Sequence, residues 1–112
     1  MSRAVKRGDV ITVAVSGDCG QPRPAVVIQS DALSESDGVL VAMFTSALRD
    51  AALYRLTIEP SENNGLKTPS QIMVDKMAAS PRGICGPVIG RLSPEEMLVL
   101  NNMLSVMIGL TD

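Results

Sequence analysis

The sequence predicts a mainly β (α+β) fold, in which a small, curled antiparallel sheet or small barrel of five to six strands carries one C-terminal helix. Short β-branched runs separated by turn residues recur along the first 92 residues, which is typical of such a sheet. One strong capping signal near the end predicts the helix. With 112 residues, 46% of them hydrophobic, we expect one core and a single domain over residues 1–112.

The expected strands are apolar runs bounded by glycine, proline or polar residues. Residues 9–15 are continuously apolar after Asp9, so this first strand is expected to be buried on both faces. Residues 53–58 alternate, and residues 59–69 form a turn-rich segment that looks exposed. The other expected strands are residues 25–30, 39–44, 71–77 and 86–92.

The helix is expected to begin at Ser93-Pro94-Glu95-Glu96, where Ser93 caps the free amides and Glu96 closes a capping box. Gly109 is a natural stop. Two interpretations of its wide apolar surface stay open: it is deeply buried, or part of it faces a second subunit. The apolar positions are Met97, Leu98, Val99, Leu100, Leu104, Val106, Met107 and Ile108.

Composition excludes several classes of site. The chain has no histidine, and Cys19 and Cys85 lie far apart, which rules out the usual zinc patterns and any histidine-based nucleophile pair. We expect no metal and no cofactor. No secretory signal or membrane-span-length apolar run is present, so we expect a cytoplasmic protein with reduced thiols. Whether the two cysteines ever pair is left open.

The charge balance favours local rather than global attraction to anions. The net charge is −2 and the pI is about 5.0, so the whole chain does not attract a polyanion. Aromatic residues make up 2%, which leaves Arg, Lys and backbone groups to bind any nucleic acid. The basic residues cluster or recur locally at Arg3, Lys6, Arg7, Lys67, Lys76, Arg82 and Arg91.

Arg23 is the most informative single position, because it stands between two prolines and just before Ala25-Val26-Val27-Ile28. Pro22 and Pro24 restrict the backbone, so a permanent cation is held at the entrance to a buried strand. A guanidinium placed there is suited to gripping a phosphate. Thr45-Ser46 end another expected strand, and these hydroxyls would position a phosphate if they lay beside Arg23.

Five segments, in their order and spacing, resemble the MazF/PemK family, the toxins of bacterial toxin–antitoxin pairs. The resemblance covers about residues 7–108. The segments are Arg7-Gly8-Asp9-Val10, Arg23-Pro24-Ala25-Val26-Val27, Thr45-Ser46, Pro69-Ser70-Gln71-Ile72-Met73-Val74-Asp75-Lys76 and Ile89-Gly90-Arg91-Leu92-Ser93-Pro94-Glu95-Glu96.

The resemblance implies an SH3-like barrel of the CcdB/MazF type, assembled as a homodimer. It also implies an mRNA interferase, a sequence-specific endoribonuclease that cuts single-stranded RNA without a metal. The 2′-hydroxyl would attack the adjacent phosphate, leaving a 2′,3′-cyclic phosphate and a 5′-hydroxyl. A cognate acidic antitoxin would cover the RNA-binding face and neutralise the toxin.

Carried over residue by residue, Arg23 and Thr45 match the family's catalytic arginine and threonine. Gln21, Ser46, Ser70 and Gln71 are expected to bind substrate, although Gln71 either contacts a base edge or orders the site.

The general base is unassigned. Some members place an aspartate where this chain has Ser70, and some carry a histidine in the first loop. Asp18 and Asp75 are the other carboxylates considered, and a structural or solvated role is favoured for both.

Two rival functions stay open. One is a non-enzymatic CcdB-like toxin that binds DNA gyrase on the same fold, since fold alone does not fix function. The other is a catalytically weakened relative that is retained for complex formation.

Overall fold

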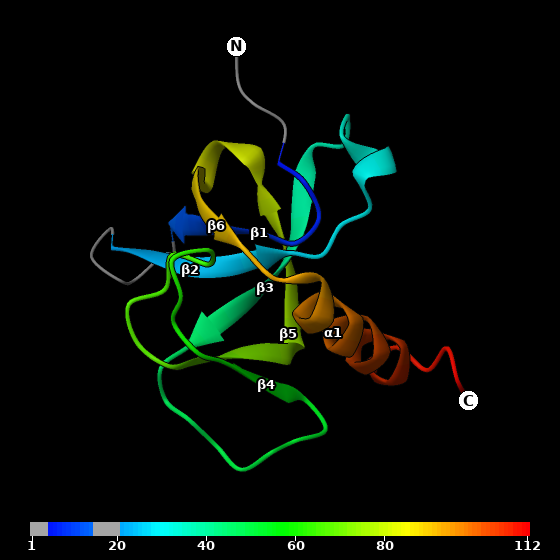
Figure 1. Ribbon diagram of the computed structural model, residues 1–112. Helices are drawn as coiled ribbons and strands as arrows, with labels where there is room; N and C mark the ends of the chain where they lie inside the picture. The colour runs from blue at the N-terminus through cyan, green and yellow to red at the C-terminus, as the bar shows by residue number, and fades with distance from the viewer. Residues whose placement is uncertain (1–4, 15–20) are drawn as a thin grey trace.

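A single antiparallel sheet of six strands forms the body of the protein, and one helix packs beside it (Figure 1). This computed structural model describes residues 5–14 and 21–112. Within them the sheet order is β4-β5-β3-β2-β1-β6, and β6 does not pair back with β4, so the curled sheet stays open. The elements are β1 (Asp9–Ala14), β2 (Pro22–Val27), the 3-10 turn η1 (Asp31–Leu33), β3 (Gly38–Thr45), β4 (Arg55–Ile58), β5 (Ser70–Pro81), the 3-10 turn η2 (Arg82–Ile84), β6 (Cys85–Arg91) and α1 (Pro94–Met107).

β5 is the longest strand, and it pairs with both β3 and β4. Its second half pairs with the first half of β3, from Gly38↔Pro81 to Ala42↔Met77. The register then shifts by three residues, and the first residues of β5 lie between β3 and β4. Extra residues on one strand bend it and increase its twist, which is how this short sheet curls.

The first strand, β1, is buried on both faces over most of its length, as predicted. Val10 belongs to the cluster that packs against α1, whereas its neighbour Ile11 belongs to a second cluster on the other face. Both side chains are fully buried. Successive residues of a strand point to opposite faces, so a continuous apolar run requires cover on both sides.

The helix begins as the sequence predicts. Ser93 Oγ accepts a hydrogen bond from the Glu96 backbone N–H at 3.1 Å, and Glu96 Oε1 accepts one from the Ser93 N–H at 2.8 Å. Gly109 follows the helix with φ +78°, a left-handed conformation that glycine adopts readily. No helix in the described ranges is long and apolar enough to cross a membrane.

Only part of the apolar helix surface is covered by the sheet. Leu100 is fully buried, and Met97, Leu104 and Met107 pack against the core. In contrast, a second group of apolar side chains is 46–64% exposed, so deep burial of the whole helix is wrong for the chain by itself. That group is Leu98, Val99, Val106 and Ile108.

The predicted strands all exist, but several of their limits are displaced. β2 starts at Pro22 because its pairing with β1 extends to Ala14↔Pro22. β4 starts at Arg55 because the preceding residues form a turn, closed by a 2.9 Å hydrogen bond from the Arg55 N–H to the Ala51 carbonyl. β5 continues to Pro81, four residues past its expected end.

Candidate active site

A groove of about 590 Å³ lies where the ends of several strands meet one long loop. β2 and β3 supply one part of its lining, and the segment from Gly65 to Thr68 supplies another. Among the described residues the lining is Thr12, Pro22, Arg23, Pro24, Phe44, Thr45, Ser46, Gly65, Leu66, Lys67, Thr68, Ser70 and Ile89.

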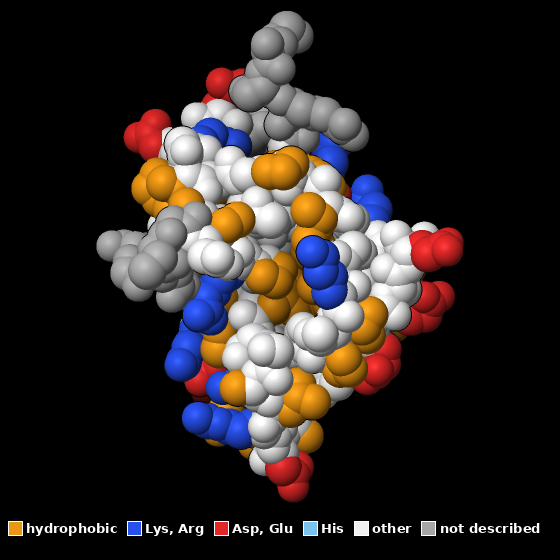
Figure 2. All heavy atoms as spheres, turned by 90° about the vertical axis from the view of Figure 1, so that its left-hand side faces the viewer, with side chains coloured by type: hydrophobic (Ala, Val, Ile, Leu, Met, Phe, Trp, Pro, Cys, Tyr) orange, Lys and Arg blue, Asp and Glu red, His pale blue; other side chains and the backbone are white. Residues whose placement is uncertain are grey.

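This groove has the composition of an anion site. It is lined by two cations, Arg23 and Lys67, and by hydroxyl groups from five residues, but by no carboxylate of the described chain. Apolar side chains such as Phe44 and Ile89 complete the lining. Figure 2 shows Lys and Arg side chains among apolar patches on one face of the molecule, with most Asp and Glu toward its edges. An anionic ligand is therefore attracted locally although the chain carries a net charge of −2.

Arg23 reaches the groove from the start of β2, where it pairs with Val13 of β1. Arg23 is exposed, whereas Ala25, Val26 and Val27 are almost completely buried. The buried half of the strand therefore anchors the exposed half. This is the rigid cation at a strand entrance that the flanking prolines predict.

Thr45 and Ser46 lie in the same groove, at the end of β3. Thr45 Oγ1 accepts a hydrogen bond from the Ala47 backbone N–H at 3.1 Å, which forms a small local turn. Because the oxygen accepts this bond, the hydroxyl proton is left to donate to a ligand. The structure thus brings together Arg23, Thr45 and Ser46, which are far apart in sequence.

Ser70 and Gln71 are both buried and both hydrogen-bonded within the protein. Ser70 lines the groove, and its hydroxyl donates to the Thr68 carbonyl at 3.0 Å. Gln71 is not a lining residue. Its amide nitrogen donates to the Arg49 carbonyl at 2.9 Å and to Thr57 Oγ1 at 3.1 Å, so of its two predicted roles this geometry favours ordering the site.

Two further residues considered from the sequence lie away from the groove. Gln21 is exposed just before β2 and does not line the groove. Asp75 is exposed on β5, also away from the groove. Asp18 and Cys19 lie outside the described residues.

Cys85 is unsuited to nucleophilic chemistry. It is a half-buried free thiol. Burial raises the pKa of the Cys85 thiol, and the nearby Arg82 opposes that shift only in part. A raised pKa keeps a thiol protonated, and the protonated form is a poor nucleophile.

Sequence patterns named Lys67 only as one of the locally recurring cations, and they did not single out Thr68 or Thr12, because a turn-rich loop and a strand threonine carry no signal of their own. They also missed Arg55, a cation that is 7% exposed. Its Nη1 is 3.4 Å from both the Ala47 carbonyl and Gln71 Oε1, and its Nε has no hydrogen-bond partner. Arg55 thus lies under the loop that follows Ser46.

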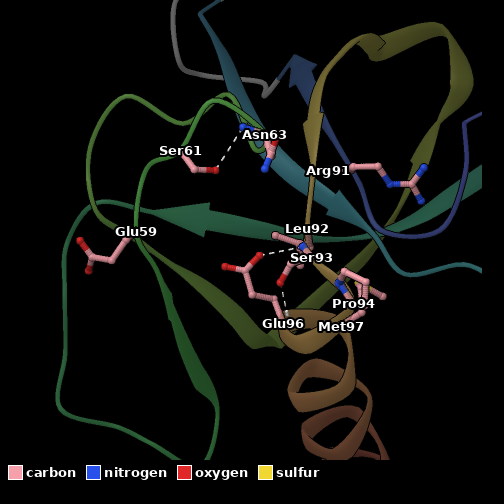
Figure 3. Close-up of a pocket in the computed structure, with 9 residues that line it drawn as sticks. All are labelled: Glu59, Ser61, Asn63, Arg91, Leu92, Ser93, Pro94, Glu96 and Met97. Atoms are coloured by element: carbon pink, nitrogen blue, oxygen red, sulfur yellow. Dashed lines mark hydrogen bonds between the residues drawn. The ribbon is translucent and has the colours of Figure 1, made fainter.

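A second groove, of about 670 Å³, lies at the start of α1 (Figure 3). Several of its polar groups are already used by the fold: Glu96 closes the helix cap, and Asn63 donates its backbone N–H to Ser61. The Arg91 side chain points away from Glu59 and Glu96, and its Nη1 lies 3.8 Å from Asp9. Two carboxylates, Glu59 and Glu96, therefore line this groove. It does not offer an anion the cationic, hydroxyl-rich lining that the described residues form around Arg23.

Comparison with known proteins points to one family. Residues 6–108 match the family model of the PemK-like, MazF-like toxins of type II toxin–antitoxin systems. A probable endoribonuclease MazF from Mycolicibacterium smegmatis is 37% identical over 107 residues, which are 95% of this chain and 98% of that protein.

Solved structures of the same kind share the fold. A mycobacterial endoribonuclease in complex with its cognate antitoxin superposes with a TM-score of 0.80 and 19% identity, over 96% of this chain and 97% of the other. The Mycobacterium tuberculosis toxin MazF-mt6 gives a TM-score of 0.77 and 20% identity, over 90% and 96% of the two chains. These neighbours confirm the predicted fold class.

Proposed function

Because this chain belongs to the PemK-like, MazF-like toxin family, we propose that it is a sequence-specific endoribonuclease that cuts single-stranded mRNA without a metal. The observation that carries the proposal is the groove that joins Arg23 with Thr45 and Ser46 and has no lining carboxylate in the described chain. A groove whose described lining holds two cations and no carboxylate suits a ligand whose backbone is anionic.

In the proposed reaction the RNA 2′-hydroxyl attacks the adjacent phosphorus and the P–O5′ bond breaks. The products are a 2′,3′-cyclic phosphate and a 5′-hydroxyl. Negative charge grows on the non-bridging oxygens in the transition state, and Arg23 stabilises that charge through its planar guanidinium. Thr45 and Ser46 donate hydrogen bonds that hold a non-bridging oxygen.

Proton transfer from the 2′-hydroxyl is assigned to no side chain of the groove. The Ser70 hydroxyl already donates to the Thr68 carbonyl, and none of the described lining residues is a carboxylate. The chain contains no histidine. Loss of a general base typically lowers a rate by about 10²–10⁴, so we expect turnover to be limited by this step.

We propose that the protein acts in the cytoplasm as a homodimer and is neutralised by a cognate acidic antitoxin. The exposed apolar side of α1 supports a second subunit, because single soluble chains seldom leave such patches uncovered. The mycobacterial neighbour that was solved with its antitoxin supports the antitoxin partner. An acidic segment would occupy the cationic groove in place of RNA.

The test is cleavage of a mixed-sequence RNA by the purified protein in EDTA, followed by mapping of the new 5′ ends. We expect 5′-hydroxyl ends at one short recurrent sequence. Arg23→Ala should lower the rate by about 10²–10³, the usual effect of removing one group that stabilises the transition state. Its urea midpoint should stay at the wild-type value, because Arg23 is exposed.

Arg23→Lys is the matched control, since it keeps the charge and loses the planar fork. Intact RNA at high protein concentration would reject the nuclease and favour the weakened relative or the gyrase binder. Cleavage that EDTA abolishes would reject the metal-independent mechanism.

A further inference from the structure

We infer that Lys67 is a second phosphate contact of the groove, one that holds the RNA strand beside the scissile phosphate and helps to place it against Arg23. The inference rests on the proposed function, and it assigns a role to a residue outside the family's matched catalytic pair.

Lys67 lines the groove together with Arg23, and these are the two cations that the described residues contribute to it. It comes from the loop between β4 and β5, whereas Arg23 comes from β2. Lys67 is exposed and forms no ion pair with a carboxylate of the described residues. Its ammonium is therefore available to a ligand in a groove to which the described residues contribute no carboxylate.

The loop that carries Lys67 is held together by a buried side chain. Asn64 is 2% exposed. Its Oδ1 accepts hydrogen bonds from the backbone N–H groups of Ser61 and Leu66, each at 3.0 Å, and its Nδ2 donates to the Glu59 carbonyl at 2.8 Å. Three bonds from one buried amide fix the backbone immediately before Lys67.

The same loop packs against β6. The Arg91 N–H donates to the Asn63 carbonyl at 2.8 Å. Gly65 has φ +71°, and a Cβ at this position would collide with the carbonyl oxygen of Ile89. The loop backbone and the strand are thus in direct contact, and this contact holds the backbone of Lys67 in place. Less conformational entropy is therefore lost when the Lys67 ammonium binds a ligand.

The chemistry of the two cations suits two different phosphates. Arginine offers a planar fork for a phosphate whose geometry must be controlled, whereas lysine is a compact charge on a flexible stem. A contact of the second kind positions a strand without reading its sequence. Lys67 therefore fits a phosphate that neighbours the scissile one.

The experiment measures binding of a fluorescein-labelled pool of randomised 2′-O-methyl RNA 20-mers, which lack the attacking hydroxyl. Fluorescence anisotropy is recorded over a range of salt concentrations for wild type, Lys67→Ala, Lys67→Arg and Lys76→Ala. Lys76 is an exposed β5 lysine outside the groove and serves as the matched control.

We expect Lys67→Ala to weaken binding on the order of tenfold at low salt, as for loss of a charge-assisted hydrogen bond. A plot of the logarithm of the association constant against the logarithm of the salt concentration has a negative slope. Its magnitude should decrease by about 0.7, the value for one phosphate on a single strand. Lys67→Arg should restore both quantities, and Lys76→Ala should leave them unchanged.

The inference is overturned if Lys67→Ala behaves like Lys76→Ala, or if wild type does not bind the pool at low salt. Because the probe cannot be cut, binding is measured whether or not the protein is a nuclease. Wild type that binds through Lys67 but leaves ordinary RNA intact would reject the proposed cleavage and still support the phosphate contact.

Discussion

The side chain of Gln71 and the backbone of Arg49 exchange two hydrogen bonds. The Arg49 N–H donates to Gln71 Oε1 at 3.0 Å, and Gln71 Nε2 donates to the Arg49 carbonyl at 2.9 Å. An antiparallel ladder uses the same two-way pattern between backbones. The buried amide of Gln71 thus ties β5 to the loop that directly follows Thr45 and Ser46, and fixes where those hydroxyls lie.

Gln71→Ala should therefore loosen the loop after β3. We expect the free energy of unfolding to fall by about 1–3 kcal/mol, because several hydrogen bonds of a buried amide are lost. Cleavage should fall as well, since Thr45 and Ser46 lose their support. Urea denaturation and the RNA cleavage rate measure the two effects.

Gln71→Glu is the control for that experiment, because it keeps the acceptor for the Arg49 N–H and loses the donors to Arg49 and Thr57. Its stability should lie between those of wild type and Gln71→Ala. Full stability and full cleavage in Gln71→Ala would contradict the role assigned to this residue.

Arg55 should be dispensable for stability if its apolar volume is preserved. The side chain is 7% exposed, its two hydrogen bonds are long at 3.4 Å, and its Nε has no partner. Replacing buried charge with well-packed apolar groups is often neutral or stabilising. Arg55→Met should leave the free energy of unfolding unchanged or raise it, by up to about 2 kcal/mol.

Arg55→Ala is the matched comparison, because it removes the charge and leaves a cavity. It should lower the free energy of unfolding by about 2–5 kcal/mol, as other large-to-small changes in cores do. Equal losses in the alanine and methionine variants would show that the guanidinium itself is needed under the loop. Urea denaturation distinguishes these outcomes.

The predictable features of this fold are those that local physics determines. The capping box of Ser93 and Glu96 forms as predicted, because its two hydrogen bonds need only neighbouring residues. Residues 9–15 predicted a strand buried on both faces, and Val10 and Ile11 are buried on opposite sides. Pro22 and Pro24 restrict the backbone of Arg23 and predict extended geometry there, and Arg23 lies in β2, paired with Val13.

The remaining features depend on long-range contacts that no local pattern encodes. The turn residues of segment 59–69 predict that it is exposed, yet Asn64 is 2% and Leu66 9% exposed. Asn64 is buried because its amide satisfies the backbone of its own loop, and because β6 covers that loop through the contacts Gly65–Ile89 and Asn63–Arg91, between residues 24 and 28 positions apart. The burial of Arg55 is not predicted by the alternating pattern of its strand. Nothing in the sequence shows that the loop 46–54 folds over this side chain.

Gly65→Ala should destabilise the protein, whereas Gly83→Ala should not. A Cβ at Gly65 would meet the Ile89 carbonyl oxygen, and φ +71° is unfavourable for any other residue than glycine. We expect the free energy of unfolding to fall by more than about 2 kcal/mol. At Gly83 a Cβ meets nothing within 4 Å, so the control should stay within about 0.5 kcal/mol of wild type.

Both glycine variants are measured by urea denaturation, and the RNA-binding assay is repeated on the folded protein. Displacement of the loop by Gly65→Ala should reduce the contribution of Lys67 to the salt dependence of binding. If Gly65→Ala is as stable as Gly83→Ala, the loop moves off β6 at little cost in free energy. That result would contradict the fixed loop backbone proposed for Lys67.

Thr45→Val tests whether the hydroxyl at the end of β3 acts on the substrate. Valine keeps the β-branched shape and removes the oxygen that accepts the Ala47 N–H, so the free energy of unfolding should fall by about 0.5–1.5 kcal/mol. Cleavage should fall by about 10²–10³ if the Thr45 hydroxyl stabilises the transition state. Thr45→Ser keeps the hydroxyl and should retain most of the cleavage rate. If Thr45 has a purely structural role, Thr45→Val should cleave RNA within a few fold of the wild-type rate under conditions where both variants are folded.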